Sequence, residues 1–396
     1  MIAERISQLL AKAPVFDGHN DLAWEMRLRA GYDLDQLDLS VDQQPTGIHT
    51  DLARLTSGGV GAQWWSVWVP DTLPVAQQVS ATLEQIDFIL RWTASQPTRL
   101  ALATSADEVL AARTAGKVAC LLGMEGGHSI GGSLGTLRMM YALGARYLTL
   151  THTRNISWAD SGTDVPAVGG LTAFGHEVVR ELNRLGMLVD LSHVAPATMR
   201  AALDTSTAPA FFSHANALAL CGHPRNVPDD VLTRVRDTDG LVMVTFVPWF
   251  LNQECREWMQ AGTDHSEQLA AAYGVDTVDY LAGVDAWEGA HPMPPCGPAD
   301  VADHLDYLRD TVGVAGVGIG GDFDGVPHTP YELQDVSTYP VLLAELARRG
   351  WSDAELAALT WGNALRVLAD TESAGRAAAA TRGPSLATIE QLDGQG

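Results

Sequence analysis

Basic residues and cysteines are scarce in this 396-residue chain. It carries 25 Lys and Arg residues against 48 Asp and Glu residues, for a net charge of −23 at pH 7, and its only lysines are Lys12 and Lys117. Nucleic acids and anionic membrane surfaces require basic patches, so we expect neither as a partner. The four cysteines lie far apart without a C-x-x-C motif, which argues against a disulfide framework and against cysteine-bound zinc.

Long apolar runs are also missing. No stretch approaches the roughly 18 apolar residues of a transmembrane helix. Residues 1–21 carry early charges and no apolar stretch followed by a small-residue cleavage site, so they do not resemble a secretory signal. The last residues lack the hydrophobic tail of a lipid-anchor signal. From these absences we expect a cytoplasmic protein.

What the sequence does contain is an alternation of strand and helix patterns. Eight short apolar segments predict strands at 14–19, 61–69, 117–125, 145–152, 186–193, 208–214, 240–247 and 316–324. Amphipathic helical patterns follow them, for example at 75–96. This order predicts an α/β fold, a closed (β/α)8 TIM barrel. An open doubly wound sheet is the alternative, but it needs a G-x-G-x-x-G turn after the first strand, where this chain has DGHND.

Three segments depart from this alternation. Residues 153–170 and 248–298 are long and irregular, and loops of that length in a compact domain usually bind ligands or act as lids. Residues 371–396 have the composition of a mobile tail. We therefore predict a single barrel domain over 1–370 with an insertion at 248–298.

Polar side chains gather where the predicted strands end. Six of the eight strand ends carry metal-ligating or acid–base residue types: His19 and Asp21, Glu125, His152, His193, His214 and Asp322. In a parallel barrel these ends share one face, where the catalytic residues of this fold are found. The sequence therefore predicts one polar site assembled from distant segments.

Each of these residues, taken singly, has a structural explanation. His19 lies in a turn-forming segment with Asp17 and Asn20, and Glu125 suits the start of a helix. A lone histidine is more often a hydrogen-bonded rim residue than a ligand. Their joint occurrence at successive strand ends instead favours a metal centre, because histidine and carboxylate are zinc ligands and a carboxylate can bridge two ions.

Several motifs resemble those of the zinc-dependent membrane (renal) dipeptidases and their bacterial relatives. They are DGHNDL (17–22), MEGG (124–127), LTLTH (148–152), VDLSHV (189–194), FSHANA (212–217), CGHPRNVPDD (221–230), GIGGDFDG (318–325) and WGNALRV (361–367). The resemblance implies an amidohydrolase-like barrel that cleaves dipeptides with two zinc ions per chain, and a homodimer. It also implies tolerance of a D-residue at the C-terminal position of the substrate.

The same resemblance implies a role for each site residue. His19 and Asp21 bind one zinc ion, His193 and His214 bind the other, Glu125 bridges them, His152 contacts the substrate and stabilises the oxyanion, Arg225 holds the substrate carboxylate, and Asp322 transfers protons. Zinc ions held this way activate water near neutral pH. The alternative is another zinc hydrolase of this fold, acting on a lactam, lactone or amide. Many such relatives bridge their metals with a carboxylated lysine, but neither Lys12 nor Lys117 ends a predicted strand.

Overall fold

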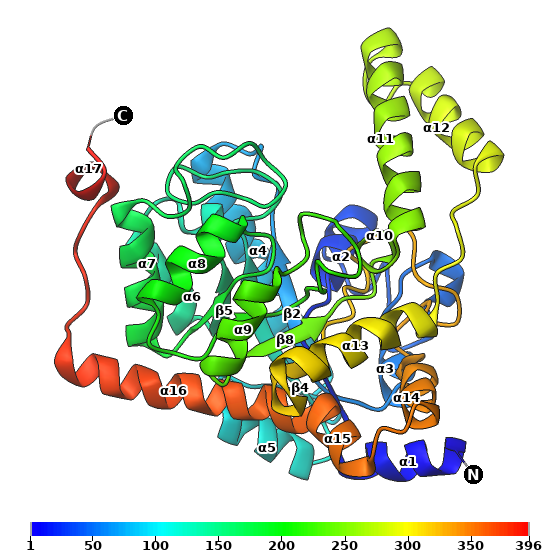
Figure 1. Cartoon of the computed structure of the whole chain (residues 1–396), viewed down its shortest axis with the longest axis horizontal. Helices are drawn as coiled ribbons and strands as arrows, with labels where there is room; N and C mark the ends of the chain where they lie inside the picture. Colours follow the sequence, from blue (N-terminus) through cyan, green and yellow to red (C-terminus); the bar gives the residue numbers. More distant parts are fainter. Residues whose placement is uncertain (1, 395–396) are drawn as a thin grey trace.

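Parallel strands form a closed barrel at the centre of the computed structural model, which describes residues 2–394 (Figure 1). The barrel strands are β1 (Val15–Asp17), β2 (Val60–Trp68), β4 (Val118–Glu125), β5 (Ala145–Thr149), β6 (Leu188–Asp190), β7 (Phe211–Phe212), β8 (Leu241–Val244) and β9 (Val317–Ile319). Neighbours pair in parallel all the way round, because β2 pairs with both β1 and β4, and β9 pairs with both β8 and β1. The predicted (β/α)8 TIM barrel is confirmed.

A ninth strand, β3 (Leu100–Leu102), was absent from the prediction. It pairs with Val118–Cys120 at the start of β4, below the point where β5 joins β4 at Leu122. Three residues carry too little periodicity to be distinguished from a loop.

Helices surround the barrel as the alternating pattern predicts. They are α1 (Ile2–Lys12), α2 (Leu22–Ala30), α3 (Leu52–Ser57), α4 (Val75–Ser95), α5 (Ala106–Thr114), α6 (Leu134–Ala142), α7 (Ala173–Leu185), α8 (Pro196–Thr205), α9 (Asp229–Asp237), α10 (Pro248–Leu251), α11 (Gln253–Tyr273), α12 (Val278–Ala290), α13 (Pro298–Val312), α14 (Tyr339–Arg348), α15 (Asp353–Ala357), α16 (Asn363–Thr381) and α17 (Ile389–Leu392). Short 3-10 turns lie at Gln44–Thr46, Gly127–Ile130 and Val314–Gly316, and a π-helical turn at Ala358–Gly362 joins α15 to α16. Among residues 2–394, no helix is long and apolar enough to span a bilayer.

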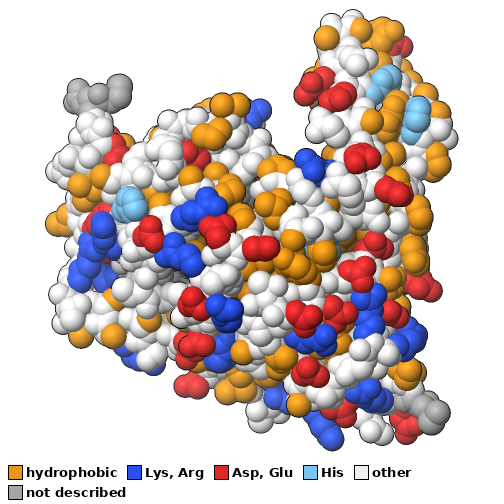
Figure 2. Space-filling model, in the orientation of Figure 1, with side chains coloured by type: hydrophobic (Ala, Val, Ile, Leu, Met, Phe, Trp, Pro, Cys, Tyr) orange, Lys and Arg blue, Asp and Glu red, His pale blue; other side chains and the backbone are white. Residues whose placement is uncertain are grey.

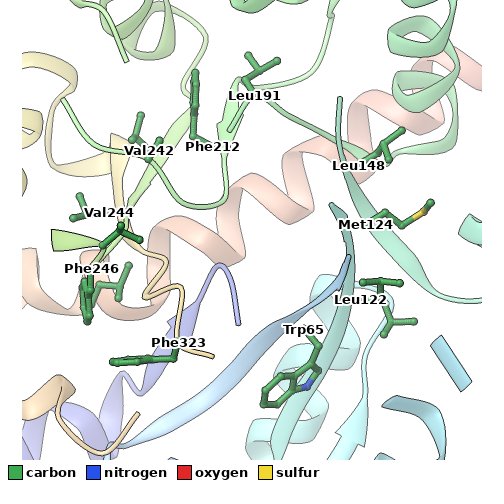
Figure 3. Packing of buried hydrophobic residues seen from close by; sticks show 14 of the residues in the cluster. Trp65, Leu122, Met124, Leu148, Leu191, Phe212, Val242, Val244, Phe246 and Phe323 are labelled. Atoms are coloured by element: carbon green, nitrogen blue, oxygen red, sulfur yellow. The ribbon is translucent and has the colours of Figure 1, made fainter. Parts of the chain in front are cut away.

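Two apolar layers hold these elements together. Outside the barrel, strand residues such as Leu122, Leu148 and Val242 pack among the buried faces of the helices (Figure 3). Inside it, Phe16 stacks on Trp64 with ring centroids 4.5 Å apart. The interior is therefore filled by side chains rather than open, and only its rim is polar.

Gly123 of β4 makes room for one of these interior rings. A Cβ at this position would overlap the ring of Tyr147. The missing side chain lets Tyr147 cross the barrel and reach His19 with its hydroxyl, at 2.8 Å from Nδ1. A glycine in mid-strand thus positions a side chain at the rim.

The insertion expected at 248–298 folds largely into a helical hairpin. Helices α11 and α12 pack on each other and project from the body of the protein beside α2 and α10 (Figure 1). The segment has no clear helical pattern in the sequence, because the apolar residues of α12 lie on all sides of the helix rather than along one face.

The C-terminal segment differs from the predicted tail beginning at residue 371. Helix α16 continues to Thr381, because the alanine-rich stretch at 377–380 has the highest helix propensity. The chain then runs along α7, where Asp393 accepts hydrogen bonds from the Thr172 hydroxyl at 2.7 Å and the Phe174 amide at 3.0 Å. The helical layer therefore extends beyond the predicted boundary at 370.

Candidate metal centre and active site

Glu125, the last residue of β4, stands at the centre of the predicted site. Its Oε2 lies 3.3 Å from His19 Nε2, beyond the end of β1. Its Oε1 lies 2.9 Å from His193 Nε2 and 3.5 Å from His214 Nε2, beyond the ends of β6 and β7. The two carboxylate oxygens therefore face different sets of imidazoles.

The remaining predicted ligand and acid join the same cluster. His19 Nε2 lies 3.3 Å from Asp21 Oδ2 and 4.0 Å from Asp322 Oδ1. Three overlapping groups have ligand atoms within 4.8 Å of one another: His19–Glu125–His214, Glu125–His152–His193 and His19–Asp21–Asp322. The structure thus brings together every predicted metal ligand, with His152 and Asp322 beside them.

Hydrogen bonds orient two of the imidazoles through their other ring nitrogen. Tyr147 lies 2.8 Å from Nδ1 of His19, and the Ser213 hydroxyl lies 2.8 Å from Nδ1 of His214. Each contact leaves the Nε2 atom directed at Glu125. Supporting contacts of this kind set ring orientation and tautomer in metal sites.

Asp190, at the end of β6, supports the ring of His214 indirectly, through the hydroxyl of Ser213. Its Oδ2 accepts hydrogen bonds from the hydroxyls of Ser213 at 2.6 Å and Thr149 at 2.5 Å, and its Oδ1 accepts from the Ser213 amide at 2.8 Å. Asp190 is not among the predicted site residues. Its place at a strand end, within the motif that contains His193, is the signal that could have identified it.

Asp17 ties the first strand to the last. This buried carboxylate accepts hydrogen bonds from the His19 amide at 2.8 Å, the Gly321 amide at 2.9 Å and the Tyr339 hydroxyl at 2.6 Å. Burial raises the pKa of Asp17, although these hydrogen bonds oppose that shift. Asp17 therefore supports the loops of His19 and of the GGDFDG motif, whereas the sequence suggested only a turn residue.

Burial and neighbouring charges set the protonation of the site. Burial would raise the pKa of Glu125, but His19 and His152 hold it well below its ordinary value. Burial, with Arg225 nearby, lowers the pKa of His193 and His214 well below 6.5. Burial would also lower the pKa of His19, but Tyr147, Glu125 and Asp21 raise it well above 6.5. An ionised Glu125 and neutral His193 and His214 are in the protonation state in which such groups bind a metal ion.

Two site residues adopt left-handed backbone conformations. His193 has φ of 68° and Asp322 has φ of 63°, each just beyond a barrel strand. Such angles are uncommon outside glycine and often mark functional turns.

Burial raises the pKa of Asp322 to about 7, with His19 opposing the rise. Gly325 packs against this carboxylate, and a Cβ there would overlap both Asp322 and Asp21.

Arg225 lies in the loop after β7, as a buried cation with free donors. Its Nη2 donates to the backbone carbonyl of His214 at 3.1 Å, while Nε and Nη1 contact no acceptor within residues 2–394. The guanidinium lies 5.3 Å from the ring centroid of Phe250. Burial lowers the pKa of Arg225 to about 10, so it stays charged at neutral pH. A buried cation with unused donors favours an anionic ligand.

A cleft of about 640 Å³ opens over this cluster. Its lining includes Glu125, His152 and Asp322 together with the aromatic residues Trp24 and Trp68. The ring centroid of Trp68 lies 4.7 Å from Trp24 and 5.2 Å from His152. The volume suits a small ligand, with apolar walls around a few polar groups.

The barrel and its rim of histidines and carboxylates define a metal-dependent hydrolase of the amidohydrolase type. The sequence pattern of the membrane dipeptidase family, peptidase family M19, matches residues 3–382. The chain belongs to this family and is a metallo-dipeptidase. The family resemblance and the predicted dipeptidase activity are both confirmed.

Individual proteins agree with that assignment. Dipeptidase 3 of Rattus norvegicus is 39% identical over 376 residues, which cover 94% of this chain and 68% of that protein. Dipeptidase aclJ of Aspergillus oryzae is 38% identical over 385 residues, covering 95% of this chain and 82% of that protein.

Solved structures share the architecture. The probable dipeptidase PvdM of Pseudomonas aeruginosa has a TM-score of 0.80 at 22% identity, covering 94% of this chain and 99% of that one, and shows the common fold. A metallo peptidase of Rhodobacter sphaeroides, liganded with a phosphinate mimic of the dipeptide L-Ala-D-Ala, has a TM-score of 0.75 at 25% identity, covering 91% of this chain and 99% of that one.

Proposed function

We propose that this protein hydrolyses dipeptides at a centre of two zinc ions and accepts a D-residue at the C-terminal position. The observation that carries the proposal is the division of contacts around Glu125. One carboxylate oxygen faces His19, and the other faces His193 and His214. A carboxylate placed in this way can serve two ions at once.

The chemistry of the donors fits zinc. In this proposal His19 and Asp21 would hold one ion, His193 and His214 would hold the other, and Glu125 would serve both. The buried Nε2 of His19 has no hydrogen-bond partner within residues 2–394, and the Nε2 atoms of His193 and His214 converge to 2.8 Å. Imidazole and carboxylate donors without thiolates are a common zinc set. Bound zinc ions would polarise the scissile carbonyl and lower the pKa of a water molecule.

The surrounding side chains then bind the substrate and move protons. Asp322 takes a proton from the attacking water and returns it to the leaving amine, because its carboxylate borders both the cluster and the cleft. His152, whose Nε2 lies 3.7 Å from Glu125 Oε1, stabilises the charge that develops on the carbonyl oxygen. Arg225 binds the free C-terminal carboxylate through its unused donors.

This arrangement limits the length of the substrate. If Arg225 holds the carboxylate while the cluster holds the scissile carbonyl, one residue separates them. The ligand of the Rhodobacter sphaeroides relative, a mimic of L-Ala-D-Ala, supports tolerance of a D-residue at the C-terminal position.

A stereochemical panel with metal analysis tests the proposal. L-Ala-L-Ala and L-Ala-D-Ala should both be cleaved, D-Ala-L-Ala should be cleaved much more slowly, and active protein should contain two zinc ions per chain. Cleavage confined to L-Ala-L-Ala would contradict the stereochemical part, and full activity with one ion would contradict the binuclear part. A β-lactam and a lactone in the same panel test the alternative substrates that the sequence left open.

We also infer a homodimer, as the family resemblance implies. Exposed apolar side chains at the tip of the hairpin, Val275 at 64% and Val278 at 82% exposure, support an interface between copies. Analytical ultracentrifugation should give twice the chain mass, and a monomer at micromolar concentration would contradict the inference.

A further inference from the structure

A cavity of about 1040 Å³ lies at the end of the barrel opposite the metal cluster. Its lining includes residues 59–61, where β2 begins, and residues 116–118, where β4 begins, and α1, α3 and α14 form its other walls. Helices α1 and α5 lie at the lower edge of the molecule in Figure 1, whereas the hairpin that follows β8 projects from the upper edge. Because catalysis in this fold takes place at the carboxyl ends of the strands, this cavity is separate from the active site.

The charged residues of this lining are all basic. Four such side chains line the cavity, and no Asp or Glu among residues 2–394 does: Arg99, Arg113, Lys117 and Arg348. Arg348 pairs with Glu345 at 2.8 Å, but no carboxylate in the described part of the chain lies within 4.0 Å of the other three. On the face drawn in Figure 2, by contrast, acidic and basic side chains are interspersed. In a chain with a net charge of −23, a purely cationic lining favours an anionic ligand.

Backbone contacts bring three of these cations together. The Val118 amide donates to the carbonyl of Arg99 at 2.9 Å, where β3 pairs with β4. The Lys117 amide donates to the carbonyl of Ala112 at 3.0 Å, next to Arg113 in α5. The three side chains therefore start from neighbouring points of the backbone and line one cavity, so a single oxyanion could contact more than one of them.

The hydrogen bonds of the two arginines leave their charge uncompensated. Nη2 of Arg99 donates to the carbonyl of Leu52 at 2.9 Å and to the hydroxyl of Thr56 at 2.8 Å. Arg113 donates to the carbonyl of Lys12. These acceptors are neutral: they orient the guanidinium groups but do not cancel their charge. An anion in the cavity would supply that compensation.

The apolar part of the lining is aliphatic. Ile2, Ile6 and Leu10 of α1 line the cavity at four-residue intervals, which places them on one face of the helix. Val341 and Ala344 contribute from α14. No Phe, Tyr or Trp among residues 2–394 lines this cavity, so a nucleotide base would find no ring on which to stack. These walls suit an aliphatic chain.

Helix α1 gives the cavity a cationic end and an apolar end. Its last residue, Lys12, is the one that accepts the hydrogen bond from Arg113. Ile2 lies at the other end of the helix, about 15 Å away along its axis. The cavity therefore extends from the cations along an apolar helix face.

We propose that this cavity binds an aliphatic molecule with an oxyanion head group, either a carboxylate or a phosphate. The head group would lie among Arg99, Arg113 and Lys117, and the chain would lie along α1. The site shares no lining residue with the active-site cleft, so it does not rest on the proposed function.

Isothermal titration calorimetry tests the proposal with decanoate and decyl phosphate, each below the concentration at which it forms micelles. At least one of them should bind, with one molecule per chain. Decanol and inorganic phosphate should bind about tenfold more weakly or less, because decanol lacks the charge and phosphate lacks the chain. The stronger of the two amphiphiles identifies the head group.

Matched variants place the ligand in the cavity. Lys117→Gln should weaken binding about tenfold, because it removes a charged hydrogen-bond donor. Ala3→Glu adds a negative charge to the lining and should abolish binding, while an acid in the first turn of α1 is compatible with the helix. Lys12→Gln changes the only other lysine, which lies outside the lining, and should bind as wild type does. Arg225→Ala should also bind normally, because the active site is not involved.

Several results would overturn the proposal. They are failure of both amphiphiles to bind at millimolar concentration, equal binding of decanol, unchanged binding in Ala3→Glu, and loss of binding in Arg225→Ala, which would place the ligand in the active-site cleft. Sedimentation with phosphatidylglycerol vesicles separates a free ligand from a membrane lipid. The protein should stay in the supernatant, and pelleting that depends on Lys117 would instead make this face a membrane contact. None of these readouts measures dipeptide hydrolysis.

Discussion

The mouth of the barrel and the helical hairpin are both formed by segments that follow barrel strands, but they differ in which side chains they bury and which they expose. At the mouth, polar groups are buried and bonded to one another, as Asp17 and Asp190 show. On the hairpin, apolar groups are exposed, and a typical internal contact is the hydrogen bond from Trp258 Nε1 to the carbonyl of His291 at 2.6 Å. The hydrogen bonds at the mouth fix the positions of individual side chains, whereas the contacts of the hairpin maintain only its overall fold.

The energetic consequences differ accordingly. A buried polar group that loses its partner costs about 1–3 kcal/mol, so the network at the mouth tolerates few changes. Surface substitutions usually change stability by less than about 0.5 kcal/mol. Substitutions at the mouth should therefore alter metal binding and chemistry, whereas those on the hairpin should alter neither.

The largest effect is expected from Glu125→Gln. Its neutral amide can no longer serve two cations, so both metal ions should be lost on dialysis and dipeptide hydrolysis should fall to the level of chelator-treated wild type. Metal analysis and a dipeptide assay check this. Glu84→Gln, at an exposed carboxylate on α4, should behave as wild type. Retention of both ions in Glu125→Gln would show that this carboxylate is not the common ligand.

Asp322→Asn should be next in size. The amide keeps the shape of the side chain but cannot take a proton, and loss of such a group typically lowers the rate about 10²–10⁴-fold. The kcat should fall while metal content stays close to normal. Asp310→Asn changes an exposed carboxylate on α13 and serves as the control. Near-normal turnover by Asp322→Asn would move the proton-transfer role to another group.

Arg225→Ala should reduce recognition of the substrate carboxylate. Removing one partner of a buried charge pair costs roughly 2–5 kcal/mol, or about 30- to several-thousand-fold in kcat/KM. Arg225→Lys should also be impaired, because an ammonium cannot supply two parallel hydrogen bonds. Wild type should cleave dipeptide amides poorly. Equal cleavage of a dipeptide and its amide would refute this role, and exposed Arg154→Ala controls for a change of charge at the rim.

Asp190→Asn should have a smaller effect that acts through His214. The variant weakens the acceptor that aligns Ser213 with His214, and loss of such a supporting contact typically lowers metal affinity about 10–100-fold. Competition with a chelator measures the change, and added zinc should restore activity. A variant that cannot be rescued by zinc would instead indicate a role in folding.

The smallest effect is expected on the hairpin. Leu281→Ser replaces a half-exposed side chain, so the free energy of unfolding should shift by less than about 0.5 kcal/mol and dipeptide turnover should stay unchanged. Denaturant unfolding and the dipeptide assay measure both. A large loss of activity in Leu281→Ser would remove the contrast between the hairpin and the mouth.

Much of the fold was predictable because its signals are local. Strand and helix periodicities predicted the barrel, and residues at strand ends predicted the cluster of histidines and carboxylates at its rim. The predicted strands were too long, however: 208–214 was expected, but the ladder covers only Phe211–Phe212. His214 lies beyond it, because the chain leaves the ladder where it forms the site. The three-residue β3 was missed because so short a strand has no distinctive periodicity. The helical end at 371–381 was missed because the composition of 371–396 as a whole indicated a tail, although its alanines favour a helix.

By itself, the sequence determined which residue types lie at the end of each strand and in what order the strands follow one another. It could do so because strand and helix patterns are local and can be recognised within short segments of the chain. Only the tertiary structure decided that the two oxygens of Glu125 face different histidines and that Tyr147 orients His19. These are contacts between distant segments. They depend on the register in which the strands close the barrel and on how the loops pack above it, which no local pattern encodes.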